Sequence, residues 1–239
     1  MQIDVLLAPQ LASNRELGEK RVVVLDILRA TSTITTALAN QALAVIPVVE
    51  PVEATDLARS IGLKECVVGG ERKGLKIEGF ELGNSPLEYT KDQVGGKKVI
   101  LCTTNGTKAI KWAQGAAEVL IGSLLNFQTL VEYLKTKTED LVIVCSGRDS
   151  NMSMEDLACA GLIIEALEQM ETAHYLTDPA LLALYTCEHV HKVGLKKFIS
   201  QTEHGRYLAE IGLAEDVAIC SSLAQYSILP RLVDGQIKI

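Results

Sequence analysis

The sequence predicts an α/β fold with three layers, in which helices cover both faces of a central sheet. Two observations lead to this prediction. Short apolar runs rich in β-branched residues alternate with helical patterns along most of the chain, which is typical of parallel sheets with crossover helices. These runs are apolar throughout, as expected for strands that are buried on both faces. The central sheet should therefore be largely parallel, or partly mixed.

The expected strands and helices alternate in chain order. The strands cover residues 3–7, 22–25, 44–49, 65–68, 99–102, 119–121 and 141–145, and a last strand is expected at 236–239. Asn40, Gly62 and Gly115 stand near expected helix ends as stop signals. The helices cover residues 31–39, 53–61, 106–114, 128–136 and 154–170. The last of these is apolar around most of its circumference and should be well buried.

The chain is expected to form one α/β domain, 1–239, because such folds often exceed 200 residues as a single unit. From about residue 178 the pattern is mainly helical, with helices expected at 180–191, 195–199 and 205–211. Residues 69–90 differ from the rest, because they contain many glycines and little periodicity. A loop of that length inside a compact domain is usually functional, so the site is expected there first.

Charge and composition limit the classes of partner. Lys plus Arg number 23 and Asp plus Glu number 30, so the net charge of −7 repels polyanions and predicts no nucleic-acid partner. The first residues lack the features of a signal peptide. The uncharged stretch 30–49 carries too many polar residues to span a membrane. Six cysteines without a Cys-x-x-Cys pair indicate buried, reduced thiols and a cytoplasmic protein.

Polar side chains follow the first long buried strand. Asp26 comes directly after the run 22–25, Arg29 follows it, and residues 31–33 are all hydroxyl residues at an expected helix start. Ligands of open α/β sheets bind beyond the carboxyl ends of the strands, where helix N-termini offer free N–H groups. Asp26 suits a hard cation and Arg29 suits a phosphate. The same pattern also fits a capped helix with an Asp–Arg ion pair.

Two later strand ends carry similar residues. Residues 103–107 read Thr-Thr-Asn-Gly-Thr at a helix start, which is an anion cradle or a plain capped turn. They lack the Walker spacing, so nucleotide binding does not follow. Arg148 follows the strand 141–145, and Glu155 and Asp156 open the buried helix. These two acids complement the helix dipole, or complete a metal site together with Asp26.

The glycine-rich segment 69–90 adds a fourth group. Glu71 and Arg72 place one metal-type and one phosphate-type side chain next to each other, and Asn84 and Ser85 follow a further glycine. A solvated charged turn is the alternative. Three strand ends and one glycine-rich segment that all offer Arg, hydroxyl or carboxylate groups favour a shared anion site.

Other phosphatase and metal patterns compete with this interpretation. Cys66 and Arg72 fit the Cys-x-x-Gly-x-x-Arg pattern of cysteine-dependent phosphatases, but Cys66 stands in a strand core and no helix start follows Arg72. The Asp-x-Asp motif of haloacid-dehalogenase-type phosphatases is absent, because residue 28 is Leu. The four histidines lie in the helical part, and His189 with His191 is more typical of a surface than of a zinc site.

At these positions the sequence resembles the 2-phosphosulfolactate phosphatase family. The resemblance spans nearly the whole chain. It is carried by the segments 26–33, 69–72, 83–86, 103–107, 147–148 and 155–161. It implies a three-layer α/β/α fold and hydrolysis of 2-phospho-3-sulfolactate to 3-sulfolactate and phosphate, a reaction of coenzyme M biosynthesis. It further implies dependence on Mg²⁺ and a homodimer.

This substrate carries a phosphate, a carboxylate and a sulfonate, so several cationic groups are needed to bind it. We expect Mg²⁺ to neutralise phosphate oxygens. The expected catalytic residues are Asp26, Arg29, Glu71 and Arg72. The expected substrate-binding residues are Thr31, Ser32, Thr33, Asn84, Ser85, Thr104, Asn105, Gly106, Thr107 and Arg148. The expected ligands of Mg²⁺ are Asp26, Glu71 and Asp156.

Three questions stay open at the level of sequence. Asp26 is either the nucleophile, which forms an aspartyl phosphate, or a metal ligand beside an attacking water. The substrate is 2-phospho-3-sulfolactate or another small phosphorylated acid. A non-catalytic binder of phosphorylated acids would use the same cradle.

Overall fold

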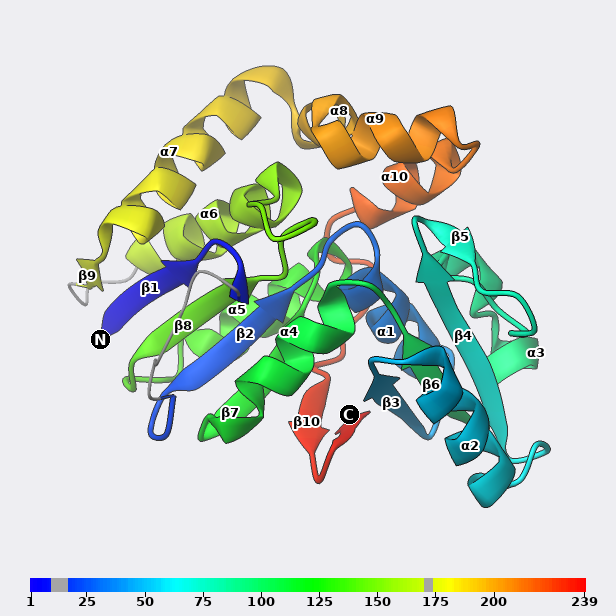
Figure 1. Cartoon of the computed structure of the whole chain (residues 1–239). Helices are drawn as coiled ribbons and strands as arrows, with labels where there is room; N and C mark the ends of the chain where they lie inside the picture. Colours follow the sequence, from blue (N-terminus) through cyan, green and yellow to red (C-terminus); the bar gives the residue numbers. More distant parts are fainter. Residues whose placement is uncertain (10–16, 170–173) are drawn as a thin grey trace.

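A computed structural model describes residues 1–9, 17–169 and 174–239 (Figure 1). Within these residues, eleven strands form one sheet in the order β5-β4-β6-β3-β11-β10-β7-β2-β8-β1-β9. The strands are β1 (Gln2–Leu6), β2 (Arg21–Leu25), β3 (Ala44–Val48), β4 (Cys66–Arg72), β5 (Leu75–Lys76), β6 (Lys98–Cys102), β7 (Glu118–Gly122), β8 (Leu141–Cys145), β9 (Tyr175–Leu176), β10 (Arg231–Val233) and β11 (Gln236–Lys238).

The sheet consists of two parallel blocks joined by a hairpin. One block is β4-β6-β3 and the other is β7-β2-β8-β1-β9. The antiparallel hairpin β10–β11 lies between them, and pairs Arg231 with Leu120 and Ile237 with Val45. The predicted α/β fold with a largely parallel, partly mixed sheet is confirmed.

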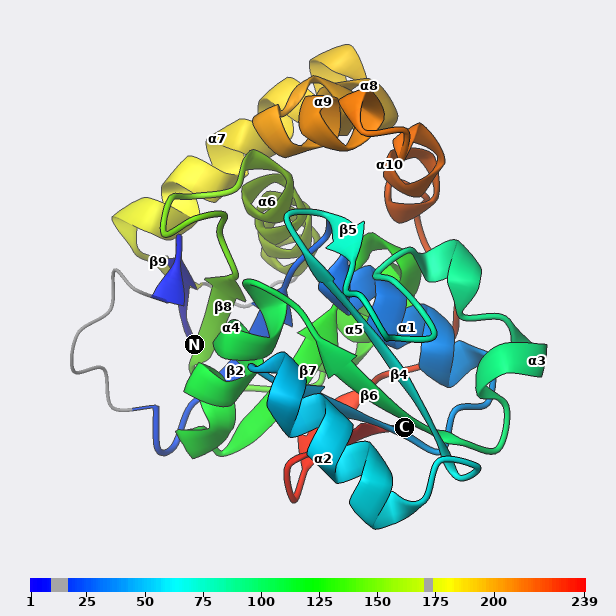
Figure 2. The same cartoon turned by 45° about the vertical axis from the view of Figure 1, so that its right-hand side comes forward.

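Helices cover both faces of this sheet. They are α1 (Ala30–Ala39), α2 (Pro51–Ile61), α3 (Lys91–Val94), α4 (Gly106–Trp112), α5 (Phe127–Leu134), α6 (Met154–Glu168), α7 (Asp178–Val193), α8 (Leu195–Gln201), α9 (Glu203–Glu210) and α10 (Ala214–Cys220). Helices α2 and α4 lie on one face and α5, α6 and α7 lie on the other (Figures 1 and 2), and the buried residues of α1 belong to the same apolar cluster as those of α4. Helix α6 is almost entirely buried, as its apolar circumference predicts. None of the described helices is both long and apolar enough to cross a membrane.

The structure differs from the predicted elements mainly at residues 69–90. The strand expected to end at Val68 continues to Arg72, because Gly69 and Gly70 pair with Leu101 and Cys102 of β6. Strand β5 and a 3₁₀ turn (Pro86–Glu88) follow, so the expected loop is partly regular. Helix α6 ends at Glu168 with Gln169 as its C-cap, so the prediction of helix at residue 169 is wrong, and Met170 falls outside the described residues.

Helices α8, α9 and α10 lie across the edge of the sheet at which β2, β4 and β8 end (Figure 1). Helix α10 was missing from the expected elements, as were the short α3, β5, β9 and β10. Residues 195–220 therefore form a helical cover over the strand ends that carry the predicted site.

Candidate active site

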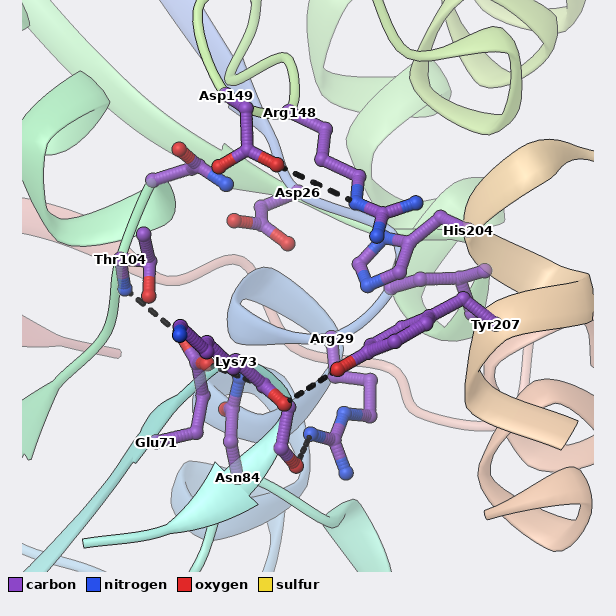
Figure 3. Close-up of a pocket in the computed structure, with 13 residues that line it drawn as sticks. Asp26, Arg29, Glu71, Lys73, Asn84, Thr104, Arg148, Asp149, His204 and Tyr207 are labelled. Atoms are coloured by element: carbon purple, nitrogen blue, oxygen red, sulfur yellow. Dashed lines mark hydrogen bonds and ion pairs between the residues drawn. The ribbon is translucent and has the colours of Figure 1, made fainter. Parts of the chain in front are cut away.

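A cavity of about 320 Å³ opens between the strand ends and the helical cover (Figure 3). We call it the strand-end cavity. Its lining comes from six separate parts of the chain. The residues that line it are Asp26, Leu28, Arg29, Glu71, Lys73, Gly74, Asn84, Thr104, Asn105, Arg148, Asp149, His204 and Tyr207.

Asp26 is fixed at the floor of the cavity by the chain around it. Its Oδ1 accepts a hydrogen bond from the N–H of Ala30 at 3.1 Å, and its own N–H donates to Thr31 Oγ1. A Cβ on Gly106 would lie 2.6 Å from Asp26 Oδ2, so only glycine allows α4 to begin this close to the carboxylate. Burial raises the pKa of Asp26, and repulsion by Glu71 adds to the increase.

Glu71 lines the same cavity as Asp26 and lies near the end of β4. Its Oε1 accepts from the N–H of Thr104 at 2.7 Å, and its Oε2 accepts from the N–H of Gly74 at 2.9 Å. Both carboxylate oxygens are therefore held by backbone donors from two different loops. Because the charge of Glu71 disfavours the Asp26 anion, a cation near both carboxylates would be favoured.

Two more oxygens in the cavity wall lack a partner. Asn84 Oδ1 and Thr104 Oγ1 are buried and receive no hydrogen bond from the described residues. Together with the carboxylates of Asp26 and Glu71 they form a set of oxygen donors only. Hard cations such as Mg²⁺ prefer such a set, and the residues present therefore fit this ion.

The cationic residues of the cavity are held by separate contacts. Arg29 donates to Asp216 Oδ2 on α10 at 2.6 Å and to the carbonyl of Gly74 at 2.6 Å. The guanidinium of Arg148 stacks 4.7 Å from the ring centroid of Tyr207, and also pairs with Glu203 at 3.3 Å. Arg29 and Arg148 thus meet the cavity from different sides, with the exposed Lys73 at its rim.

Helix α9 contributes a histidine to the cavity. His204 Nδ1 lies 3.2 Å from Glu155 Oε1, and the side chain of Glu155 is only 3% exposed. Burial would raise the pKa of Glu155, but the hydrogen bond and the charge of His204 outweigh it and hold the pKa low. The imidazole also lowers the pKa of Asp26 by electrostatic attraction, which places the two groups within reach of each other's charge.

Asp156 lies in the layer beneath the cavity and is not among the residues that line it. Its Oδ1 accepts from the N–H of Ile27 at 2.8 Å, and Ser146 Oγ lies 3.2 Å from its Oδ2. Burial, followed by repulsion from Asp26 and Glu155, raises its pKa well above the ordinary value. Among the residues described, Asp26, Glu71 and Asp156 do not bring their ligand atoms into one tight cluster, whereas the carboxylate of Glu165, the thiol of Cys187 and the imidazole of His191 do.

Of the residues predicted for the site, seven line the cavity: Asp26, Arg29, Glu71, Asn84, Thr104, Asn105 and Arg148. The predicted hydroxyl residues after Asp26 do not line it. Thr31 and Ser32 donate to the carbonyls of Asp26 and Ile27, and Thr33 donates to the carbonyl of Asn84. They shape the loops that carry the site.

Four further predicted residues also stand behind the cavity wall. Ser85 donates to Asp216 Oδ1 at 2.6 Å, and Thr107 donates to the carbonyl of Thr103. Gly106 provides the close approach to Asp26 described above. Arg72 donates to the carbonyls of Glu71 and Val49, so its guanidinium is engaged between β4 and the loop after β3.

Cys66 does not line the cavity either. Its thiol lies in hydrogen-bonding range of the carbonyls of Ala58 and Gly62, and burial raises its pKa. A nucleophilic thiol needs the opposite shift. The structure therefore gives no support to a cysteine-dependent phosphatase.

Five groups near the reacting region escaped sequence reasoning: Lys73, Asp149, His204, Tyr207 and Asp216. Lys73 and Asp149 adjoin predicted residues and could have been found by including the neighbours of Arg72 and Arg148. The other three lie on α9 and α10, far along the chain. Their helical pattern carries no sign that these helices cover the strand ends.

Known proteins resemble this chain over nearly its whole length. A family model described as 2-phosphosulpholactate phosphatase matches residues 6–235. A protein of Clostridium perfringens (strain 13 / Type A) is 42% identical over 100% of this chain and 96% of its own length. Proteins of Caldanaerobacter subterraneus subsp. tengcongensis and Clostridium acetobutylicum are 40% and 39% identical, over 95% and 99% of this chain and 93% and 100% of their own lengths. All three are named "Probable 2-phosphosulfolactate phosphatase".

Proposed function

The chain belongs to the 2-phosphosulpholactate phosphatase family, and on that basis we propose that it hydrolyses 2-phospho-3-sulfolactate to 3-sulfolactate and phosphate in the strand-end cavity. The family resemblance stated from the sequence motifs is thereby confirmed, and with it the class of phosphoric monoester hydrolases. The observation that carries the proposal is the cavity itself, in which two carboxylates and two unpartnered oxygens line the same space as two arginines.

The charge pattern of the cavity suits this substrate. Arg29 and Arg148 enter from different sides, with Lys73 at the rim, which offers separate cationic contacts to anionic groups several bonds apart. A guanidinium binds a phosphate, carboxylate or sulfonate through two parallel N–H donors. Arg29 is already oriented by Asp216, so little conformational freedom is lost when it binds an anion.

Mg²⁺ is the ion that we propose for the acidic side of the cavity. Asp26 and Glu71 would hold it, with Asn84 Oδ1 and Thr104 Oγ1 as further oxygens, while Asp156 would orient the Asp26 loop from beneath. Bound there, the ion would neutralise phosphate oxygens and lower the barrier to attack by an oxygen nucleophile. Backbone donors keep both carboxylates in place before the ion binds.

Asp26 has two possible parts in the reaction, and both fit its position. It either attacks phosphorus and forms an aspartyl phosphate, or it holds the ion while water attacks. The stereochemical outcome at phosphorus separates the two routes. With a substrate made chiral at phosphorus by oxygen isotopes, two displacements through an aspartyl phosphate retain the configuration, whereas direct attack by water inverts it.

The proposal is tested by phosphate release from 2-phospho-3-sulfolactate beside phospholactate and phosphoglycolate, with Mg²⁺ and with EDTA. Preference for the sulfonate substrate and loss of activity in EDTA are the expected results. Asp26→Asn should abolish release, whereas Asp56→Asn, on an exposed Asp–Arg pair, should leave it unchanged. Activity on phospholactate alone would indicate another phosphorylated acid. Binding without phosphate release would indicate a binder and overturn the proposal.

We further propose that the enzyme acts as a cytoplasmic homodimer and serves the biosynthesis of coenzyme M. Buried, unpaired cysteines support a reducing compartment, since all six cysteines are free and buried. Light scattering of the purified protein tests the dimer. Measuring sulfolactate in cells that lack the enzyme tests the pathway.

A further inference from the structure

Hydrolysis of the proposed substrate needs a proton donor for the leaving group, and the arginines of the cavity do not supply one. The group that leaves phosphorus is the alkoxide of a secondary alcohol, which is strongly basic. Its departure is slow unless a proton reaches the bridging oxygen as the bond to phosphorus breaks. Arg29 and Arg148 are poor proton donors because a guanidinium does not deprotonate in proteins. The cavity therefore needs a donor of another kind.

We propose that His204 is this general acid, and that Glu155 is the positioning residue that orients it. The proposal rests on the proposed phosphatase function and deepens it. His204 lies on α9, and Figure 3 shows its imidazole between Arg148 and Tyr207, reaching into the strand-end cavity on the side of Asp26. It thereby joins the helical cover to the reacting region.

The contact between His204 and Glu155 has the geometry expected when a carboxylate holds the imidazole of a proton donor in one orientation. Glu155 faces Nδ1 at 3.2 Å, so Nδ1 carries a hydrogen and Nε2 is the ring nitrogen left for the cavity. The side chain of Glu155 is 3% exposed, so the packing around it restricts its movement. As an anion behind the ring, it stabilises the protonated imidazole that can donate from Nε2.

Other proton-bearing groups in the cavity wall are less suited to this step. The hydroxyl of Tyr207 donates to the carbonyl of Lys73 at 2.9 Å, so its proton is engaged. Lys73 itself lies exposed at the rim. Among the described lining residues, His204 is the only histidine, and histidine is the side chain most often used for proton transfer near neutral pH. Efficient general acids have a pKa near the operating pH.

The proposed step balances in protons and electrons. As an oxygen nucleophile forms its bond to phosphorus, the bond from phosphorus to the bridging oxygen breaks and its electron pair moves to that oxygen. The oxygen takes the proton from His204 Nε2 and leaves as the alcohol. Of the two hydrogens of the water consumed, one stays on hydrogen phosphate and the other returns to the neutral imidazole.

The test compares leaving groups, because a structural role for His204 would not depend on them. With 2-phospho-3-sulfolactate, His204→Asn should lower kcat by about 100-fold or more. With phosphoenolpyruvate or 4-nitrophenyl phosphate, whose leaving groups need little protonation, the loss should be under about 10-fold. Glu155→Gln should show the same selectivity with a loss of about 10-fold. Equal losses on both kinds of substrate would overturn the proposal.

Matched controls come from a second His–Glu pair. His191 lies 2.8 Å from Glu165 on α7 and α6, and neither residue lines the cavity. His191→Asn and Glu165→Gln should therefore keep wild-type rates with every substrate. If they lower the rate with the same selectivity as the cavity pair, the proposal is wrong.

A second measurement uses the sulfonate substrate alone. His204→Ala should be partly rescued by added imidazole, which can donate a proton from the space left by the side chain, whereas Asp26→Asn should not. Absence of rescue in a folded His204→Ala protein would count against the general acid. If the wild-type enzyme releases no phosphate from any substrate, the proposed function fails, and that result is distinct from a His204 variant that matches an active wild type.

Discussion

Arg29 and Asp216 form a buried ion pair across 187 residues of sequence, with Arg29 Nη1 2.6 Å from Asp216 Oδ2 and both side chains 3% exposed. Asp216 also accepts a hydrogen bond from Ser85 Oγ at 2.6 Å. One carboxylate on α10 therefore ties a cationic residue of the cavity to the loop that carries Asn84. The helical cover and the site loops are joined at this point.

Removing Asp216 should be costly, because Arg29 would remain buried without its charge partner. We expect Asp216→Ala to lower the free energy of unfolding by about 3–5 kcal/mol, measured by urea denaturation. Glu53→Ala, at the more exposed pair with Lys111, is the control and should lose no more than about 1 kcal/mol. A similar small loss for both variants would contradict this account of the ion pair.

Gly106 should be intolerant of any side chain. In Gly106→Ala the new Cβ would meet Asp26 Oδ2 at 2.6 Å and Ala30 Cβ at 2.5 Å, so the carboxylate must move. A displacement of about 1 Å is enough to reduce kcat by about 100-fold, as measured by phosphate release. Gly115→Ala serves as the control, since nothing lies within 4 Å of its new Cβ. Normal kcat in Gly106→Ala would show that Asp26 need not be held where it lies.

Asn84 should affect the requirement for Mg²⁺ more than the maximal rate. Its Oδ1 is buried without a partner, and the proposed ion would satisfy it. We expect Asn84→Ala to raise the Mg²⁺ concentration for half-maximal activity by about 10-fold, with kcat at saturating Mg²⁺ falling less. Asn151→Ala, at an exposed position outside the cavity, should leave the Mg²⁺ curve unchanged. An unchanged curve in Asn84→Ala would remove its amide oxygen from the ion site.

Because of the ion pair of Arg21 and Glu118, the free energy of unfolding should depend on pH in the acidic range. Burial would raise the pKa of Glu118, but hydrogen bonds from Arg21 and Tyr133 outweigh it and lower the pKa below its ordinary value of 4.5. A carboxyl with a lowered folded-state pKa stabilises the fold above pH 4.5, and this stabilisation is lost as the pH falls through the folded-state pKa.

Glu118→Gln should therefore lose stability at pH 7 and show a weaker decline between pH 5 and pH 3, by about 1–2 kcal/mol in urea denaturation. Glu78→Gln, at an exposed position, should keep the wild-type pH profile. Parallel profiles for wild type and Glu118→Gln would show that this pair does not govern the acid response.

The sequence predicted the fold well where local pattern and tertiary structure agree. The buried strands β2, β6 and β8 are continuous apolar runs, and few other structures suit such runs between helical patterns. Prediction failed where pairing decides the structure. Gly69 and Gly70 have no strand preference of their own, and they are extended because β6 offers them hydrogen bonds.

The residues of the candidate site likewise divide into those whose position the sequence could predict and those whose position it could not. Residues that follow strands, such as Asp26 and Thr104, could be predicted to meet because parallel strands end at a common edge. The sequence pattern could not predict which of their neighbours face the cavity. Arg72 and Lys73 are adjacent in sequence, and of the two only Lys73 lines the cavity. The place of His204 at the cavity depends on how α9 packs over the strand ends, and no pattern within the sequence of α9 indicates this packing.

The hairpin β10–β11 also has a consequence for how the protein is made. Residues 231–238 occupy the seam between β3 and β7, and both of those strands are synthesised long before the hairpin. Until it is added, each parallel block exposes an open edge with unpaired backbone groups, which is a template for association with other chains. The nascent protein therefore passes through a vulnerable interval that closes only when the hairpin leaves the ribosome.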